Sequence, residues 1–218
     1  MKTQSAIPIE DRPKLERFLS DIAKWCQVDI ERCVNENYPS CSAADVWDDK
    51  QYMSGVAGAP CTLELKREAR RQWESRNKCD WHVLGFTCDE IDRYTKFASR
   101  ERGNVIPVLI DDGITKEDCF EIIAAAGIQP PRIYSMGYPN ANCIGCVKAT
   151  SATYWNHVRK MHPLAFKARA EQSRRIGCRL VRHNGKRIFL DELPVDAVGA
   201  PMQNWNVECG IFCSEDDK

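Results

Sequence analysis

The sequence predicts an α/β protein in which helices flank a parallel sheet. Short apolar runs alternate along the chain with longer segments of helical periodicity, a pattern typical of strand–helix–strand units. With 218 residues, 43% of them hydrophobic, the chain is long and apolar enough for one domain with its own core. An Asn-Gly pair between two apolar runs near the C-terminus predicts an added hairpin.

The first part of the chain contains helical patterns separated by short strand patterns. Apolar residues recur with a helical period at Leu15, Phe18, Leu19, Ile22 and Cys26. Residues 28–34 have the short apolar pattern of a strand, and a short helix is expected near residues 43–47. A longer helix, rich in Lys and Arg, is expected over residues 61–77, followed by a buried-strand pattern at residues 83–86.

The middle of the chain predicts two helices on either side of a strand. Acidic residues at its start favour a helix over residues 88–99. Residues 105–110 have a strand pattern, and Pro107 within it suggests an edge strand because proline cannot donate to a neighbouring strand. Thr115 and Asp118 have the spacing of a capping box and predict a helix that follows them.

The C-terminal part predicts two more helices and the hairpin. Helical patterns cover residues 151–161 and 163–176, and Pro163 separates them. Asn184-Gly185 lies between two short apolar runs, which is a strong signal for a two-residue hairpin turn. Residues 191–218 have no periodic pattern and are expected to form loops.

Charge and targeting signals restrict the function only in part. The formal net charge is zero, so the whole chain offers no argument for binding nucleic acid or a membrane. Residues 159–187 are strongly basic, however, either as a solvated helix face or as a surface that faces phosphate or sulfate groups. No stretch reaches the roughly 18 apolar residues of a membrane helix, and the N-terminus lacks the apolar part of a signal peptide. We therefore expect a cytoplasmic protein without a membrane partner.

The twelve cysteines are the main chemical signal in the sequence. In a reducing compartment they are expected to be thiols, metal ligands or catalytic groups rather than disulfides. Cys143 and Cys146 form a CxxC on a turn, and Cys209 and Cys213 form a looser CxxxC pair near the C-terminus. We expect the chain to bring both pairs close to Cys61. Such a set could bind zinc or an iron–sulfur cluster, act as a redox dithiol, or consist of unliganded structural thiols.

Several motifs, taken in order, resemble the phosphoadenosine phosphosulfate (PAPS) reductase family, in its often phage-borne, PAPS-reductase-like branch. The motifs are residues 52–55, 59–66, 83–87 with Asp89, Glu90 and Arg93, 113–119, 142–146, 154–156 and 189–193. The similarity covers about residues 10 to 213. Each motif alone is weak, and their order along the chain is what makes the set specific.

This resemblance implies an adenine nucleotide α-hydrolase-like parallel sheet with flanking helices. The family holds its nucleotide on a Ser-Gly-Gly-x-x-Ser loop after the first strand, and this sequence has no such loop. The chain is therefore expected to lack the first strand and the phosphate loop, through shortening or as a natural derivative. We expect residues 1–135 to form a truncated nucleotide-binding-like α/β domain. Residues 136–218 would add the CxxC loop, helices, hairpin and cysteine-bearing tail, packed as one unit with the first part.

The resemblance also implies roles for the cysteines. Glu208-Cys209-Gly210 resembles the element whose nucleophilic cysteine attacks a sulfonate sulfur, forming a thiosulfonate that a thioredoxin-like reductant resolves; Phe212 replaces the family's histidine. In the iron–sulfur branch, Cys61 and the pair Cys143 and Cys146 resemble cluster ligands, although Pro60-Cys61 stands where the family has two cysteines. Cys209 or Cys213 would supply the fourth ligand, so Cys209 has two competing assignments. A 4Fe-4S cluster is favoured, with zinc as the alternative.

Basic residues in or beside these motifs are candidates for binding an anionic substrate. Lys66, Arg93 and Lys148 could contact an adenine nucleotide or another adenylated or sulfur-bearing small molecule. The expected function is sulfur or sulfonucleotide chemistry by a PAPS-reductase-like enzyme. The alternatives are a degenerate, non-catalytic module that binds metal or nucleotide, and an accessory protein in the sulfur modification of nucleic acid.

Overall fold

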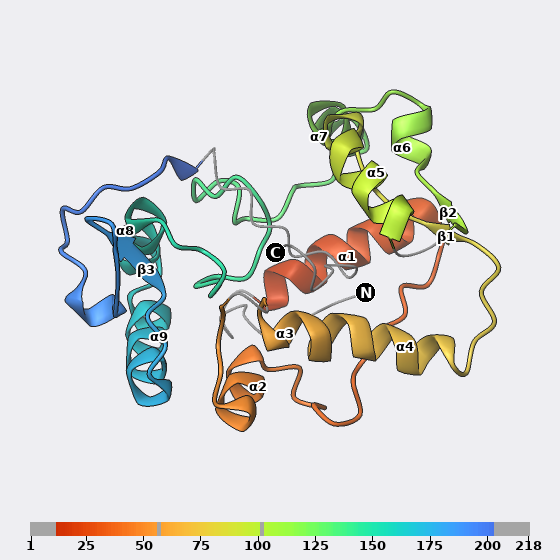
Figure 1. The fold of residues 1–218 in the computed structure, drawn as a ribbon. Helices are drawn as coiled ribbons and strands as arrows, with labels where there is room; N and C mark the ends of the chain where they lie inside the picture. Colours follow the sequence, from red (N-terminus) through yellow and green to blue (C-terminus); the bar gives the residue numbers. More distant parts are fainter. Residues whose placement is uncertain (1–11, 56–57, 101–102, 203–218) are drawn as a thin grey trace.

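A computed structural model describes residues 12–55, 58–100 and 103–202 of the chain (Figure 1). It confirms a mixed helix-and-sheet protein. In the described residues, β1 (His82–Val83) pairs in parallel with β2 (Val105–Ile106), and β3 (Val181–His183) pairs antiparallel with β4 (Lys186–Ile188). The small parallel pair is compatible with the predicted α/β class.

The first predicted helix is confirmed, and the strand predicted after it is wrong. Helix α1 (Arg12–Cys26) spans the apolar stripe. Residues 28–35 are irregular, and the side chains of Val28 and Ile30 are exposed to solvent. A strand is stable only when a neighbouring strand pairs with it, and this segment has no such neighbour in the described part of the chain. Helix α2 (Ala43–Lys50) then begins at its cap, Ser42, near the predicted position.

The long helix predicted near residue 61 is present as one continuous helical segment with an irregular middle. It consists of α3 (Pro60–Thr62), the π-helical turn η2 (Leu63–Glu68) and α4 (Ala69–Glu74). Pro60 occupies its first turn, where a missing N–H costs nothing. π-Helical turns are rare and frequently occur at functional sites. The turn η2 and the short helix α3 before it are therefore candidates for part of a functional site.

Between residues 82 and 125 the chain forms the strands β1 and β2 and several short helices. The 3-10 turn η3 (Cys88–Glu90) leads into α5 (Ile91–Arg100). The strand predicted over residues 105–110 ends after Ile106, because the carbonyl of Pro107 accepts a bond from the Ile110 N–H and starts α6 (Val108–Asp111). Helix α7 (Lys116–Ala125) begins at the predicted cap, where Thr115 and Asp118 bond each other.

The C-terminal elements follow their predictions closely. Helices α8 (Ala152–Met161) and α9 (Pro163–Ile176) are separated at Pro163. In the β3–β4 hairpin, Asn184 and Gly185 both have positive φ (49° and 74°), as a type I′ turn requires. The 3-10 turn η4 (Leu190–Glu192) follows the hairpin within the region expected to be loop.

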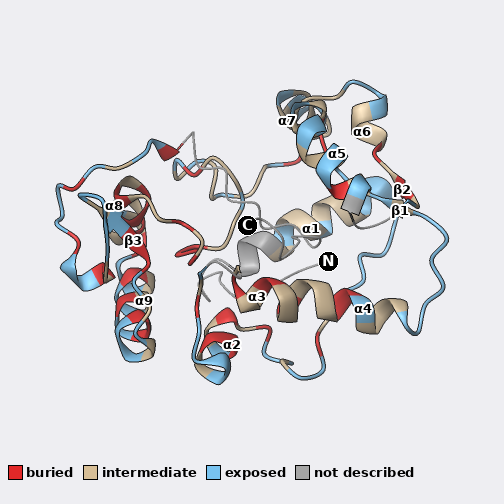
Figure 2. Ribbon diagram, viewed as in Figure 1, coloured by how far each residue is buried: buried red, intermediate tan, exposed pale blue. Residues whose placement is uncertain are grey.

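Most buried side chains belong to one cluster, which we call the main core. It combines residues from α2 and the helical segment that starts at Pro60 with residues of α8, α9, β3 and η4. It therefore takes side chains from both sides of the expected boundary at residues 135/136. A separate small cluster, the Phe86 cluster, contains the buried residues Phe86, Phe97 and Val105. Figure 2 shows buried residues concentrated along α8, α9 and β3. No described helix is long and apolar enough to cross a membrane.

Candidate functional site

The CxxC forms a tight turn just before α8. Cys143 is half-buried and Cys146 is buried, with Gly145 between them at φ +67°. The buried hydroxyl of Tyr154 bridges the turn: it accepts a hydrogen bond from the Cys146 N–H (3.0 Å) and donates one to the Cys143 carbonyl (3.3 Å). Burial raises the pKa of Tyr154 well above its ordinary value, so the phenol remains protonated and able to donate. A residue of the first turn of α8 thus holds both ends of the CxxC.

The ring of Trp155 packs against the same turn. The ring is fully buried, and the indole Nε1–H donates to the carbonyl of Ala149 (2.8 Å). A Cβ atom at Gly145 would lie 3.7 Å from this ring, so the turn rests directly on it. The next residue, Asn156, donates to the carbonyls of Pro194 and Ala197. Consecutive residues of one motif therefore fasten the CxxC turn and the segment after η4 to α8.

A buried guanidinium lies beside the CxxC turn. Arg169 of α9 stacks on the ring of Trp47 (4.0 Å from the ring centroid) and donates to the side chain of Gln172. Its Nε atom is buried and has no hydrogen-bond partner among the described residues, and a Cβ atom at Gly145 would lie 3.8 Å from it. No carboxylate of the described residues lies within ion-pair distance of Arg169.

Three cysteines act electrostatically on Arg169. Burial lowers the pKa of Arg169 to about 10, and negative charge on Cys61, Cys143 and Cys146 opposes that shift. Cys61 lies in α3, is half-buried, and packs against the main core, which also contains Ile144 of the CxxC turn. Two segments far apart in sequence thus bring their thiols within electrostatic reach of the same cation. Thiolates beside a buried cation can bind a soft metal or carry out dithiol chemistry.

The structure covers the candidate metal ligands only in part. Cys209 and Cys213 lie outside the described residues. The ten cysteines within the described residues are thiols. Among the residues that the structure describes, no three His, Cys, Asp or Glu side chains form a group arranged to hold a metal ion. Cys61, Cys143 and Cys146 are therefore of the right chemical type and in the same neighbourhood, but they are not a preformed metal cage.

The predicted basic residues lie in different places. Lys66 belongs to η2, five residues after Cys61, and Lys148 is half-buried two residues after Cys146. Arg93 lies in α5, where it pairs with Glu90 and stacks on the ring of Phe86 (5.2 Å). Its contacts are therefore those of the Phe86 cluster, whereas Lys66 and Lys148 belong to the segments that carry the cysteines.

Arg169 is not among the residues that the sequence motifs predict for the site. A signal was present, because Arg169 stands three residues after Phe166 and one before Ala170, both buried on the inner stripe of α9. A cation on an apolar helical stripe either extends its charge to the surface or meets a buried partner. Distinguishing these outcomes required knowing which segment packs against α9.

Comparisons with known proteins found no matching family model, no matching curated protein and no matching solved structure.

Proposed function

We propose that the chain carries out sulfur chemistry at a thiolate site formed around Arg169, as a PAPS-reductase-like enzyme. The observation that supports this most directly is that Arg169, a buried guanidinium packed against Gly145 of the CxxC turn, lies within electrostatic reach of Cys61, Cys143 and Cys146. A buried charge without a counter-ion is costly, typically by several kcal/mol. No described carboxylate forms an ion pair with Arg169, although, against the opposing effect of burial, its charge contributes to lowering the pKa of Asp48. Thiolates, or the net negative charge of a thiolate-bound metal centre, would provide an additional counter-ion.

In this proposal the cysteines divide into ligands and a nucleophile. Cys61, Cys143, Cys146 and Cys213 bind a 4Fe-4S cluster, with zinc as the alternative that four thiolates suit equally well. When bound, the metal centre ties the CxxC turn to α3 and to the tail, so that metal binding supports folding. Cys209 is the nucleophile: its thiolate would attack the sulfonate sulfur of the substrate, and the S–O bond to the nucleotide phosphate would break with that phosphate as the leaving group, leaving a thiosulfonate on Cys209. A thioredoxin-like dithiol would then attack the Cys209 sulfur, release sulfite and be oxidised to a disulfide.

The proposed substrate is an adenylated or other sulfur-bearing small molecule. Lys66 and Lys148 supply positive charge on the two segments that carry the cysteines, which suits a sulfate or phosphate group. The parallel pair β1–β2 would then belong to an adenine nucleotide α-hydrolase-like sheet. We assign Arg93 the lesser role of supporting the nucleotide-binding part, because its charge is already paired with Glu90.

Metal analysis after anaerobic purification tests the proposal. We expect about four iron atoms per chain with a visible absorption band, or one zinc ion. Cys143→Ser and Cys146→Ser should lose the metal, whereas Cys178→Ser should keep it because that half-buried thiol donates to the Ser54 carbonyl. Absence of metal from the wild type, or equal metal content in all variants, would contradict the metal assignment.

Arg169 provides a second test of the same site. Arg169→Met should weaken metal binding roughly 10- to 100-fold, the usual cost of losing a group that supports metal ligands. Arg169→Lys retains a cation and should lose less. Arg175→Met is a matched control on the same helix, since Arg175 is exposed and pairs with Asp48 (2.6 Å). Metal affinity that is unchanged in Arg169→Met would remove Arg169 from the proposed site.

A third test concerns the nucleophile. Cys209→Ser should still bind substrate but should form no covalent sulfur adduct by mass spectrometry of the intact protein. Substrate turnover by this variant would exclude Cys209 from the role.

A further inference from the structure

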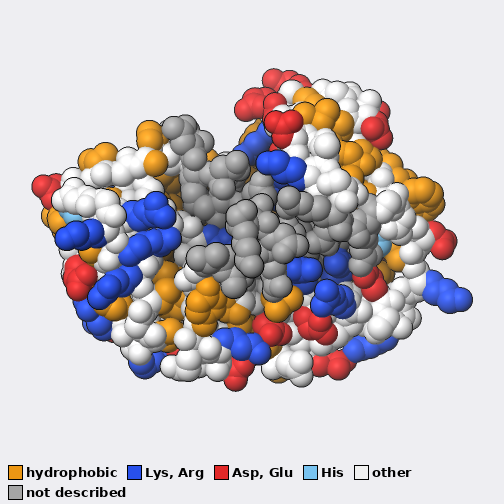
Figure 3. Space-filling view, in the orientation of Figure 1, with side chains coloured by type: hydrophobic (Ala, Val, Ile, Leu, Met, Phe, Trp, Pro, Cys, Tyr) orange, Lys and Arg blue, Asp and Glu red, His pale blue; other side chains and the backbone are white. Residues whose placement is uncertain are grey.

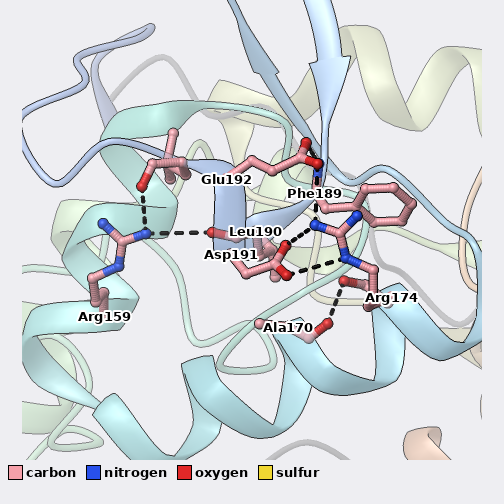
Figure 4. A network of polar contacts seen from close by, with 9 residues as sticks. Arg159, Ala170, Arg174, Phe189, Leu190, Asp191 and Glu192 are labelled. Carbon is pink, nitrogen blue, oxygen red and sulfur yellow. Dashed lines mark hydrogen bonds and ion pairs between the residues drawn. The ribbon is translucent and has the colours of Figure 1, made fainter.

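The region from Arg159 to Arg187 contains ten Lys and Arg residues and a single acidic residue, Glu171. Several of the ten have structural partners. Arg159 donates to the carbonyls of Leu190 and Leu193, and Arg174 pairs with Asp191 and Glu192 (Figure 4). These two arginines attach η4 and the segment around it to α8 and α9. Their positive charges therefore have a structural role and do not require a bound ligand.

The positive charges on the hairpin have no such explanation. We define the hairpin surface as Arg179, Arg182, Lys186 and Arg187, all of which are exposed. Arg179 contacts only the ring of Phe189 through its guanidinium (5.3 Å). None of the four forms an ion pair with a carboxylate in the described part of the chain. The hairpin therefore displays four cations that the protein does not neutralise there.

The register of the hairpin places like charges directly opposite each other. Arg182 is the cross-strand partner of Arg187. Like charges in opposite positions destabilise a strand pair. Besides burial, which is the larger cause, the charge of Arg182 lowers the pKa of Arg187, so the two charges do repel each other.

The arrangement also holds these charges in place. Arg187 donates to the carbonyl of Leu180 (2.8 Å), which restrains its guanidinium beside Arg182. The backbone N–H of Arg182 donates to the carbonyl of Thr150 (2.8 Å), so β3 is attached to the segment that follows the CxxC. Ordering repelling cations on a restrained hairpin is unfavourable unless an anion binds between them.

The shape of the hairpin surface favours an extended polyanion over a small anion. The hairpin turn is exposed, and a two-stranded ribbon with outward-pointing Arg side chains can enter the major groove or lie along the backbone of a duplex. Arg forks match phosphate oxygens in bidentate contacts. Figure 3 shows Lys and Arg side chains gathered on the side of the molecule that carries α8, α9 and β3. Cations spread over an exposed hairpin suit a polyanion with regularly spaced phosphates better than a single small anion.

We propose that the hairpin surface binds the phosphate backbone of double-stranded nucleic acid. The proposal is independent of the thiolate site, and either one can fail alone. The attachment of β3 to Thr150 would hold the bound duplex on the side of the protein that carries the CxxC segment.

Fluorescence anisotropy with a labelled DNA duplex tests this proposal on the full chain. Wild type should bind, with an affinity that falls steeply between about 50 and 200 mM salt. The double variant Arg182→Ser/Arg187→Ser should bind at least tenfold more weakly, and the slope of log affinity against log salt should fall by about 1.8, or about 0.9 for each lost phosphate contact.

The control removes two exposed charges elsewhere. Lys24→Ser/Lys96→Ser changes the net charge equally, on α1 and α5, and should bind like wild type. Thermal melting should show that the Arg182/Arg187 variant is folded and no less stable than wild type, because a repulsive pair has been removed. If it does not fold, Arg179→Ser/Lys186→Ser removes the other two charges of the surface without touching the bond to Leu180.

Three outcomes would overturn the proposal. They are no binding of the duplex by wild type, equal weakening in the hairpin and control variants, and tighter binding to anionic lipid vesicles than to the duplex. The last outcome would instead assign the surface to a membrane headgroup layer.

Discussion

The main core and the Phe86 cluster differ sharply in how deeply their side chains are buried. The largest fully buried side chains of the described residues, including Trp47, Tyr154 and Trp155, belong to the main core. The Phe86 cluster has three buried residues, and Trp81 and Val83 beside it are largely exposed. In Figure 1, β2 and α5, which carry Val105 and Phe97 of this cluster, lie on the opposite side of the molecule from α8 and α9.

This difference in packing determines which part of the protein can hold reactive side chains in a fixed geometry. A site is precise only when packing and hydrogen bonds hold the groups that support it. The CxxC turn rests on Tyr154 and Trp155, both fully buried, whereas Arg93 lies in a thin cluster at the other side. The more deeply packed part of the molecule therefore carries the CxxC thiols, and we predict that the Phe86 region is the less stable part.

The largest expected effect comes from breaking the main core. Trp155→Ala should lower the free energy of unfolding by about 4 kcal/mol, because it leaves a cavity and removes the bond to Ala149. Urea denaturation followed by circular dichroism measures this loss. Trp81→Ala is the control in the other region and should change stability by less than about 0.5 kcal/mol, since its side chain is exposed. Similar losses in both variants would contradict the assigned difference between the regions.

A smaller effect is expected from two glycine substitutions that strain the backbone equally, only one of which lies at the CxxC turn. Gly145→Ala and Gly113→Ala both place a side chain at positive φ (67° and 68°) and should each cost about 1 kcal/mol. The added methyl group meets Trp155 and Arg169 only at Gly145, while space at Gly113 is open. Thiol reactivity toward a maleimide reagent should therefore change only in Gly145→Ala. A change in both variants would mean that the two regions are coupled through the backbone.

The smallest effect concerns the start of α7, near the Phe86 cluster. Hydrogen bonds from the hydroxyl and the N–H of Thr115 lower the pKa of the Asp118 carboxyl. A depressed folded pKa stabilises the protein above the unfolded value of about 3.9, and this contribution is lost as the pH falls through the folded pKa. Asp118→Asn should thus have a slightly lower urea midpoint than wild type at neutral pH, with the gap closing in acid. A gap that stays constant with pH would contradict the role of the charge.

Local signals in the sequence predicted the elements whose cause is local. The apolar stripe of α1, the capping pair of α7 and the Asn184-Gly185 turn were correct because each depends on residues within a few positions of one another. The predicted strand at residues 28–34 was wrong for the complementary reason. Its apolar residues fit a strand, but pairing depends on another segment, and none pairs there in the described residues.

The candidate thiol site also combines features that local sequence predicts with features that depend on long-range packing. The sequence by itself determined that the chain has a CxxC on a turn, a helix after it and a basic hairpin, because these follow from residue types at short spacing. Only the tertiary structure placed Arg169 against that turn and Cys61 within electrostatic reach of Arg169. It also decided that Arg174 pairs with carboxylates, whereas the hairpin cations pair with no carboxylate of the described residues. The physical reason is that burial and pairing of charges depend on which helices pack together, and long-range packing leaves little trace in a local pattern.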